Sequence, residues 1–123
     1  MATKPQVIAL EEHYLDPEVK PYITGPDVTR QPKVSARLDD VGQGRIAEMD
    51  MAGIDMQVLS HGAPSVQRLD AELAVRLARG ANDRLAETVR SHPDRFIASP
   101  SCGVPARTWQ RQPPGGWWRA TGP

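Results

Sequence analysis

Val7-Ile8-Ala9-Leu10-Glu11-Glu12-His13-Tyr14 is the stretch from which the fold can be worked out. Its apolar run contains Val and Ile and is typical of a buried β-strand. Because successive side chains of a strand point to opposite faces, Glu11 and His13 are expected on one face and Glu12 on the other. A carboxylate and an imidazole placed in this way suit a metal ion. The pattern is short and common, however, and a strand that simply ends in polar residues at the solvent edge gives the same sequence.

The composition excludes several classes of protein. The 123 residues suffice for one small domain. The 15 basic and 15 acidic residues balance, so the net charge gives no reason to expect binding to nucleic acid or to an acidic membrane. The single cysteine, Cys102, excludes an intrachain disulfide and a Cys-rich zinc site. Without an apolar run long enough for a membrane span or a secretory signal, we expect a soluble, cytoplasmic protein.

Hydrophobic periodicity places the remaining elements. It predicts a helix over Leu38–Ala52, a strand over Ile54–Ser60, a long helix over Val66–Ser91 and a strand over Arg95–Ser99. Asp40 and Gln43 have the spacing of a capping box, and Gly53 is expected to end the first helix in the left-handed conformation. The proline-rich connection from Leu15 to about Ala36 excludes a regular helix, and it could cover a site at the end of the first strand or be a simple surface loop.

Strands that alternate with helices favour an α/β fold with a parallel sheet. A parallel sheet is normally covered on both faces, which about three strands and two helices cannot achieve. A closed barrel of eight strands needs about 250 residues. The body of the chain is therefore expected to be the first third of something larger.

Five segments resemble the N-terminal region of the amidohydrolase-2 family: Ile8–Tyr14, Gly44–Ser60, Ala63–Gln67, Ala81–Ala86 and His92–Phe96. This is the family of aminocarboxymuconate-semialdehyde decarboxylase and of the resorcylate and dihydroxybenzoate decarboxylases. The resemblance implies the N-terminal part of a (β/α)₈ TIM barrel that binds zinc or manganese at the carboxyl ends of its strands. It matches Glu11 and His13 with the first two metal ligands.

The function that this resemblance implies is the decarboxylation of an aromatic or unsaturated carboxylic acid, in a protein that is often homo-oligomeric. The metal would orient the substrate and stabilise charge on the ring carbon as it is protonated. Other members are metal-dependent hydrolases, and the N-terminal region does not separate the two chemistries. His61 follows the second strand and could contact substrate, although the family does not dependably place a histidine there.

The last part of the sequence departs from the family. Residues 100–123 hold three arginines, three tryptophans and no acidic residue. They show no helical or strand periodicity, and this composition is typical of GC-rich DNA read out of frame. We therefore expect a truncated barrel domain over 1–99 and an irregular, out-of-frame tail over 100–123, in a chain that is inactive alone. In the alternative interpretation the Trp/Arg tail is genuine, and it makes the chain a non-catalytic interaction module.

Overall fold

A three-stranded parallel sheet forms the centre of the molecule. The computed structural model describes residues 4–23 and 32–101. The strands are β1 (Ile8–Tyr14), β2 (Met56–His61) and β3 (Phe96–Ser99), and they lie in the order β1-β2-β3. Both neighbouring pairs are parallel, which confirms the α/β prediction.

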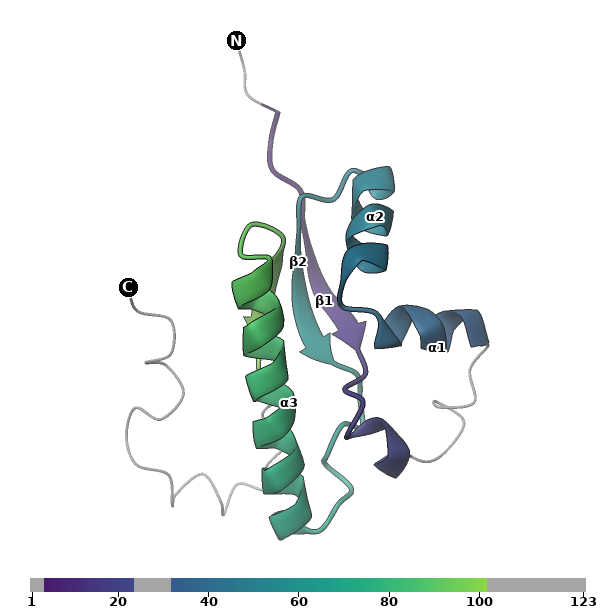
Figure 1. The fold of residues 1–123 in the computed structure, drawn as a ribbon, viewed down its shortest axis with the longest axis vertical. Coiled ribbons are helices and arrows are strands. Elements are labelled where there is room, and N and C mark those ends of the chain that lie inside the picture. Colours follow the sequence, from purple (N-terminus) through teal and green to yellow (C-terminus); the bar gives the residue numbers. More distant parts are fainter. Residues whose placement is uncertain (1–3, 24–31, 102–123) are drawn as a thin grey trace, which may run out of the picture.

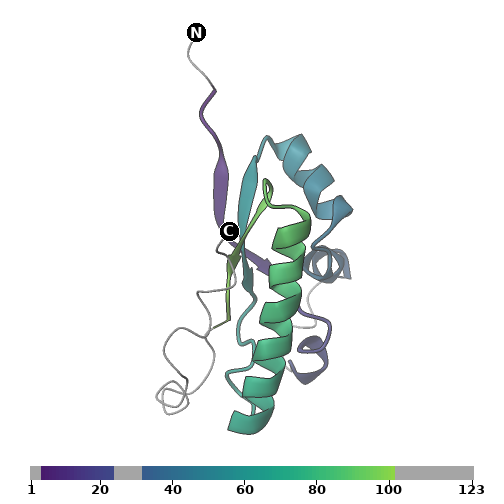
Figure 2. The ribbon, with the colours of Figure 1, turned by 60° about the vertical axis from the view of Figure 1, so that its left-hand side comes forward.

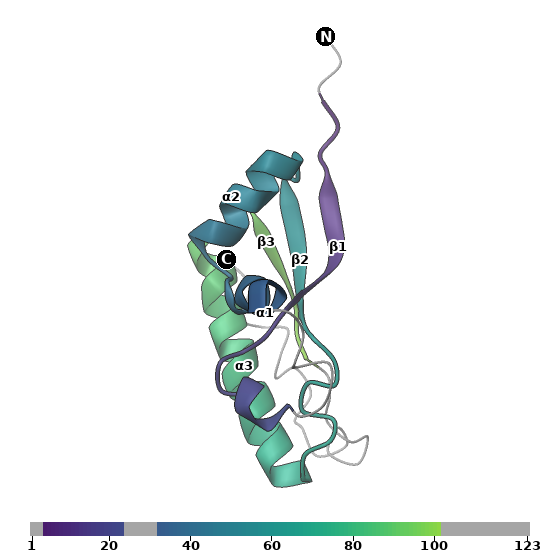
Figure 3. The same ribbon diagram turned by 90° about the vertical axis from the view of Figure 1, so that its right-hand side faces the viewer.

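The helices lie together on one face of this sheet, as Figures 1 and 3 show. They are α1 (Pro32–Asp39), α2 (Gln43–Ala52) and α3 (Ala71–Ser91), and a short 3₁₀ turn, η1, covers Lys20–Tyr22. The long α3 connects β2 to β3 in the sequence, and it runs along the sheet (Figure 2). The described part of the chain therefore has two layers, with one face of the sheet left without a helix.

Two apolar clusters fill the space between the layers. In the first, one side chain from each strand packs between α2 and α3; its buried members are Tyr14, Met49, Leu59, Leu85 and Phe96. In the second, the segments after β1 and after β2 pack against the N-terminal half of α3; its buried members are Leu15, Val19, Ile23, Val66, Ala74, Leu77, Ala78 and Ala81. The side chains of Leu59 and Val19 are completely buried, so the sheet and the segment that follows β1 are both held by α3.

The region before β2 differs from its prediction. Two helices occupy it, and the first begins at Pro32, inside the segment from which the prolines were expected to exclude a helix. Proline is tolerated at the first helical position because its missing N–H has no partner there anyway. Asp40 is not the cap of α2: it accepts a hydrogen bond from the Gly42 N–H at 2.7 Å, and Gly42 is the N-cap residue.

The ends of α2 and α3 show where the sequence signals were reliable. Gly53 ends α2 with a φ of 70°, as expected for a left-handed C-terminal glycine. The long helix begins at Ala71 rather than Val66, because Asp70 is its N-cap and its carboxylate accepts a hydrogen bond from the Leu73 N–H at 3.0 Å. Its C-terminal end at Ser91 agrees with the prediction.

The apolar run of β1 is not buried as expected. Ile8 and Leu10 are exposed, and Leu10 retains 70% of its accessible surface. These residues lie on the strand at the edge of the sheet, and nothing within the described residues covers the face opposite the helices. The exposed side chains of Ile8 and Leu10 are therefore available to pack against residues outside the described part of the chain.

No helix within residues 4–23 and 32–101 is long and apolar enough to cross a membrane. The predicted tail lies outside the described residues from 102 onward, so its out-of-frame origin and its alternative role in binding stay predictions.

Candidate metal centre

The carboxyl ends of the three strands meet at one edge of the sheet, because all three run in the same direction. β1 brings Glu11, Glu12 and His13 to this edge, β2 brings Ser60 and His61, and β3 brings Ser99. Ligand sites of α/β proteins lie at the carboxyl ends of parallel strands, because loops leaving these ends converge there. This is the edge at which we expected the metal ligands.

A β-bulge decides which way His13 points. Ala9 pairs with Gln57 while Glu12 pairs with Leu59, so β1 uses one more residue than β2 over this interval. Without the extra residue, His13 would align with His61, whose side chain is buried on the helix side. With the bulge, His13 aligns with Ser60 and is exposed. The bulge thus moves His13 from the helix-covered face to the open face.

Contacts from β2 and α2 hold His13 in place. Its ring nitrogen Nδ1 lies 3.1 Å from the Ser60 hydroxyl oxygen. Its carbonyl oxygen accepts a hydrogen bond from the Arg45 guanidinium at 2.9 Å. Arg45 also donates to the carbonyl oxygens of Arg37 and Asp40, at the end of α1 and just beyond it. The second ring nitrogen of His13, Nε2, has no hydrogen-bond partner among the described residues.

Glu11 is the residue at the bulge, and it has a φ of 59°. The regular alternation from which we expected Glu11 and His13 on one face therefore does not hold at this position. Glu11 is exposed, and no hydrogen bond or ion pair to another described residue holds its carboxylate. A non-glycine residue in this conformation costs about 1–2 kcal/mol, and such residues gather at functional sites. Its role as a metal ligand stays a prediction.

His61 lies on the other side of β2. It is buried, its Nε2 accepts a hydrogen bond from the Asp16 N–H at 2.9 Å, and its Nδ1 lies 3.0 Å from the Gly62 carbonyl oxygen. Its ring meets the Tyr14 ring edge-on. Burial lowers the pKa of the imidazole. These contacts favour a structural role, and substrate binding by His61 stays a prediction.

Asp16 and Arg84 form an ion pair between a buried carboxylate and a half-exposed guanidinium, which no sequence pattern indicated. The Asp16 side chain is 1% exposed, and both of its oxygens accept hydrogen bonds from Arg84 at 2.7 Å. Burial alone would raise the pKa of this carboxyl group, but the hydrogen bonds from Arg84 and from the Glu18 and Val19 N–H groups lower it overall. The pair ties the segment after β1 to α3. No local pattern connects two residues so far apart in the sequence.

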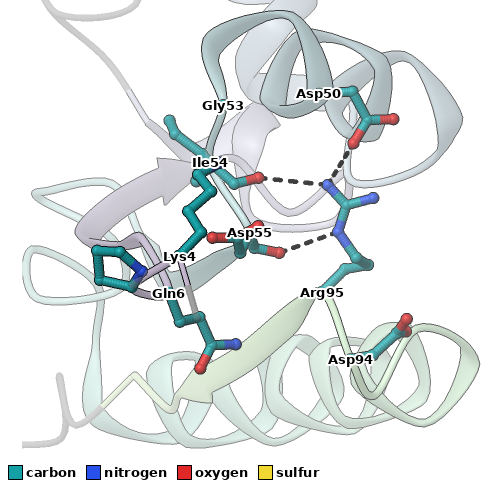
Figure 4. A pocket seen from close by; sticks show the side chains of 9 residues that line it. Lys4, Gln6, Asp50, Gly53, Ile54, Asp55, Asp94 and Arg95 are labelled. Atoms are coloured by element: carbon teal, nitrogen blue, oxygen red, sulfur yellow. Dashed lines mark hydrogen bonds and ion pairs between the residues drawn. The ribbon is translucent and has the colours of Figure 1, made fainter. Parts of the chain in front are cut away.

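A hollow of about 650 Å³ lies at the opposite edge of the sheet, where the strands begin (Figure 4). Arg95 crosses it, pairing with Asp50 at 2.7 Å and donating to the carbonyl oxygens of Ile54 and Asp55. The contacts of Arg95 therefore join α2 to the start of β3, and its guanidinium is already bound by groups of the chain itself.

Within the described residues no group of three or more His, Cys, Asp or Glu side chains is arranged to hold a metal ion. A carboxylate oxygen and an imidazole nitrogen are suitable donors for manganese or zinc. A catalytic zinc site ordinarily has three protein ligands. Glu11 and His13 therefore fit a metal by donor type but are too few to complete its coordination.

Comparison with known proteins shows which enzymes the chain resembles. No protein-family model matches the chain. Gamma-resorcylate decarboxylase of Rhizobium radiobacter is 40% identical over 96 residues, which are 74% of this chain and 28% of the relative. The chain is similar to aromatic-acid decarboxylases, which are members of the amidohydrolase-2 family. It spans about a third or less of the length of the relatives it matches.

Solved structures of such decarboxylases share the fold. The 5-carboxyvanillate decarboxylase of Novosphingobium aromaticivorans, solved with manganese and a nitrobenzoic acid, has 33% identity and a TM-score of 0.70 over 78% of this chain and 33% of its own. The dihydroxybenzoic acid decarboxylase of Polaromonas, solved with manganese and 2-nitroresorcinol, has 35% identity and a TM-score of 0.68 over 81% of this chain and 31% of its own. The three strands and their helices thus correspond to an N-terminal part of a TIM barrel, as predicted.

Proposed function

We propose that this chain supplies the first two metal ligands, Glu11 and His13, of a manganese- or zinc-dependent decarboxylase that acts on an aromatic carboxylic acid. The observation that carries the proposal is the placement of His13. It lies at the carboxyl end of a parallel strand, faces the open side of the sheet, and has Nε2 without a partner among the described residues. The relatives that share this fold have aromatic-acid decarboxylase activity, and two of them were solved with manganese.

The residues of this chain would contribute to the reaction by holding the metal's position. When bound, the metal would orient the substrate carboxylate and stabilise negative charge on the ring carbon that loses carbon dioxide. Ser60 and Arg45 would fix the ring and the backbone of His13, and the bulge would bring Glu11 to the same edge. The remaining strands of the barrel would pair at the sheet edges formed by β1 and β3, so that they would enclose the open face, supply the other ligands and exclude water.

A chimera tests the proposal. Residues 1–99 of this chain would replace the matching region of gamma-resorcylate decarboxylase from Rhizobium radiobacter. We expect the chimera to release carbon dioxide from its substrate in the presence of manganese, and we expect the His13→Gln and Glu11→Gln chimeras to lose this activity. His92→Gln, at the C-terminal end of α3, is the control and should retain it.

The isolated chain should behave differently from the chimera. Two ligands hold a metal weakly, so the 123-residue chain should bind Mn²⁺ with low affinity and show no turnover. A folded chimera that keeps its activity after His13→Gln would contradict the assignment of this ligand. A chain that binds one Mn²⁺ tightly without a partner would contradict the view that its coordination is incomplete.

A further inference from the structure

We propose that Ser60 is a positioning residue that selects the tautomer of His13. In this arrangement the His13 Nδ1–H donates to the Ser60 hydroxyl oxygen, and Nε2 presents its lone pair to the open face. The inference rests on the proposed function, because it deepens the role of His13 as a ligand. It goes beyond that function by assigning a task to a residue outside the ligand pair.

The register of the sheet carries the first step. His13 and Ser60 are direct partners in the β1–β2 ladder. Side chains of residues opposite one another in a ladder lie on the same face. The bulge at Glu11 creates this pairing, because an unbulged β1 would place Glu12 opposite Ser60. The bulge therefore places the His13 side chain beside the Ser60 hydroxyl group.

The contact geometry carries the second step. The distance of 3.1 Å between Nδ1 and the hydroxyl oxygen is a hydrogen bond. A hydroxyl group can donate or accept, so the contact alone permits either tautomer. If His13 bound a metal through Nε2, that nitrogen would need a free lone pair, which it has when Nδ1 carries the proton and donates to Ser60.

The surroundings of His13 carry the third step. Arg45 holds the His13 carbonyl oxygen, so the backbone on which the ring turns is fixed by α2. The ring itself is exposed, and Ser60 is its hydrogen-bonding partner among the described residues. Removal of the hydroxyl group should therefore free the ring to rotate and to exchange tautomers, while the fold remains intact.

The experiment is nitrogen NMR of the 123-residue chain labelled with ¹⁵N-histidine. Spectra are recorded without metal at about pH 8, where an ordinary imidazole is neutral. The chain has three histidines, and single His→Gln variants assign their signals. Wild-type His13 should show the pattern of the Nδ1–H tautomer. Ser60→Ala should shift His13 toward a mixture of tautomers, and Ser60→Thr, which keeps the hydroxyl group, should retain the wild-type pattern.

Ser99→Ala is the matched control, because Ser99 on β3 pairs with Ser60 on β2 and is exposed at the same edge. It should leave the His13 signals unchanged. A wild-type His13 in the Nε2–H form would overturn the proposal, and so would an unchanged tautomer in folded Ser60→Ala. If Ser60→Ala does not fold, the wild-type and Ser60→Thr spectra still decide, since both must show the Nδ1–H form.

Addition of MnCl₂ separates this inference from the proposed function. Paramagnetic broadening should centre on His13, and Ser60→Ala should need about 10–100-fold more Mn²⁺ for the same broadening, as for other residues that hold a metal ligand. Broadening that leaves His13 untouched would refute the ligand assignment, even if Ser60 sets its tautomer. A tautomer insensitive to Ser60, together with Mn²⁺ bound at His13, would refute the positioning role alone.

Discussion

Both faces of the sheet carry leucine side chains, but those on one face are buried and those on the other are exposed. On the helix-covered face, Leu59 is completely buried among side chains of all three strands and two helices. On the open face, Leu10 is 70% exposed and His13 is also exposed. The covered face therefore contains the apolar core, while the open face carries the candidate metal ligand His13.

Leu59 and Leu10 allow the same substitution to be made on both faces of the sheet. Leu59→Ala should lower the free energy of unfolding by about 2–5 kcal/mol, because it leaves a cavity in the covered core. Leu10→Ala should change it by less than about 0.5 kcal/mol, because its side chain is already exposed. Urea denaturation followed by circular dichroism measures both. Equal losses would show that the open face is covered in solution.

The sequence revealed the elements that depend on local patterns. Parallel strands, the left-handed Gly53 and the end of α3 at Ser91 follow from periodicity and from the conformational freedom of glycine. The division of the predicted helix into α1 and α2 was missed, because a proline-rich segment can still begin a helix at Pro32.

The candidate site was predicted in part. The positions Glu11 and His13 came from a short pattern and a resemblance, but the face to which His13 points depends on pairing between strands. A bulge at Glu11 is invisible to an argument based on alternation, because it appears only when the registers on its two sides are compared. The Asp16–Arg84 pair was missed for the same reason, since tertiary packing brings the two residues together.

The ion pair gives a second test of the covered side. Arg84→Met should lower the free energy of unfolding by about 1.5–3 kcal/mol, because it removes charged hydrogen bonds from the buried Asp16 carboxylate. Arg90→Met is the matched control on the same helix, because Arg90 pairs with Glu87 at the surface and such pairs contribute about 0.2–1 kcal/mol. Thermal unfolding at neutral pH compares them, and similar losses would mean that burial of Asp16 adds nothing.

The bulge can be tested through the conformation of Glu11. Glycine adopts a positive φ readily, whereas a β-branched residue resists it. Glu11→Val should therefore be about 1–2 kcal/mol less stable than Glu11→Gly. The pair of variants removes the carboxylate in both cases, so their difference reports the backbone alone. Equal stabilities by urea denaturation would argue that residue 11 does not have a positive φ in solution.

The smallest expected effect concerns His61, the buried counterpart of the exposed His13. Burial lowers the pKa of His61, and its Nε2 must stay unprotonated to accept the Asp16 N–H. The unfolded chain therefore binds a proton at higher pH than the folded chain does. Stability from this group is fully present above the ordinary histidine pKa of about 6.5 and is lost as the pH falls below it.

His61→Gln separates this contribution from the rest of the chain. The Gln amide oxygen can still accept the Asp16 N–H, but the side chain does not titrate. Urea denaturation at about pH 7.5 and about pH 5.5 should show a smaller loss of stability in the variant than in the wild type. Identical losses would mean that His61 is protonated in the folded state, and the hydrogen bond that joins β2 to the segment after β1 would then have to break in acid.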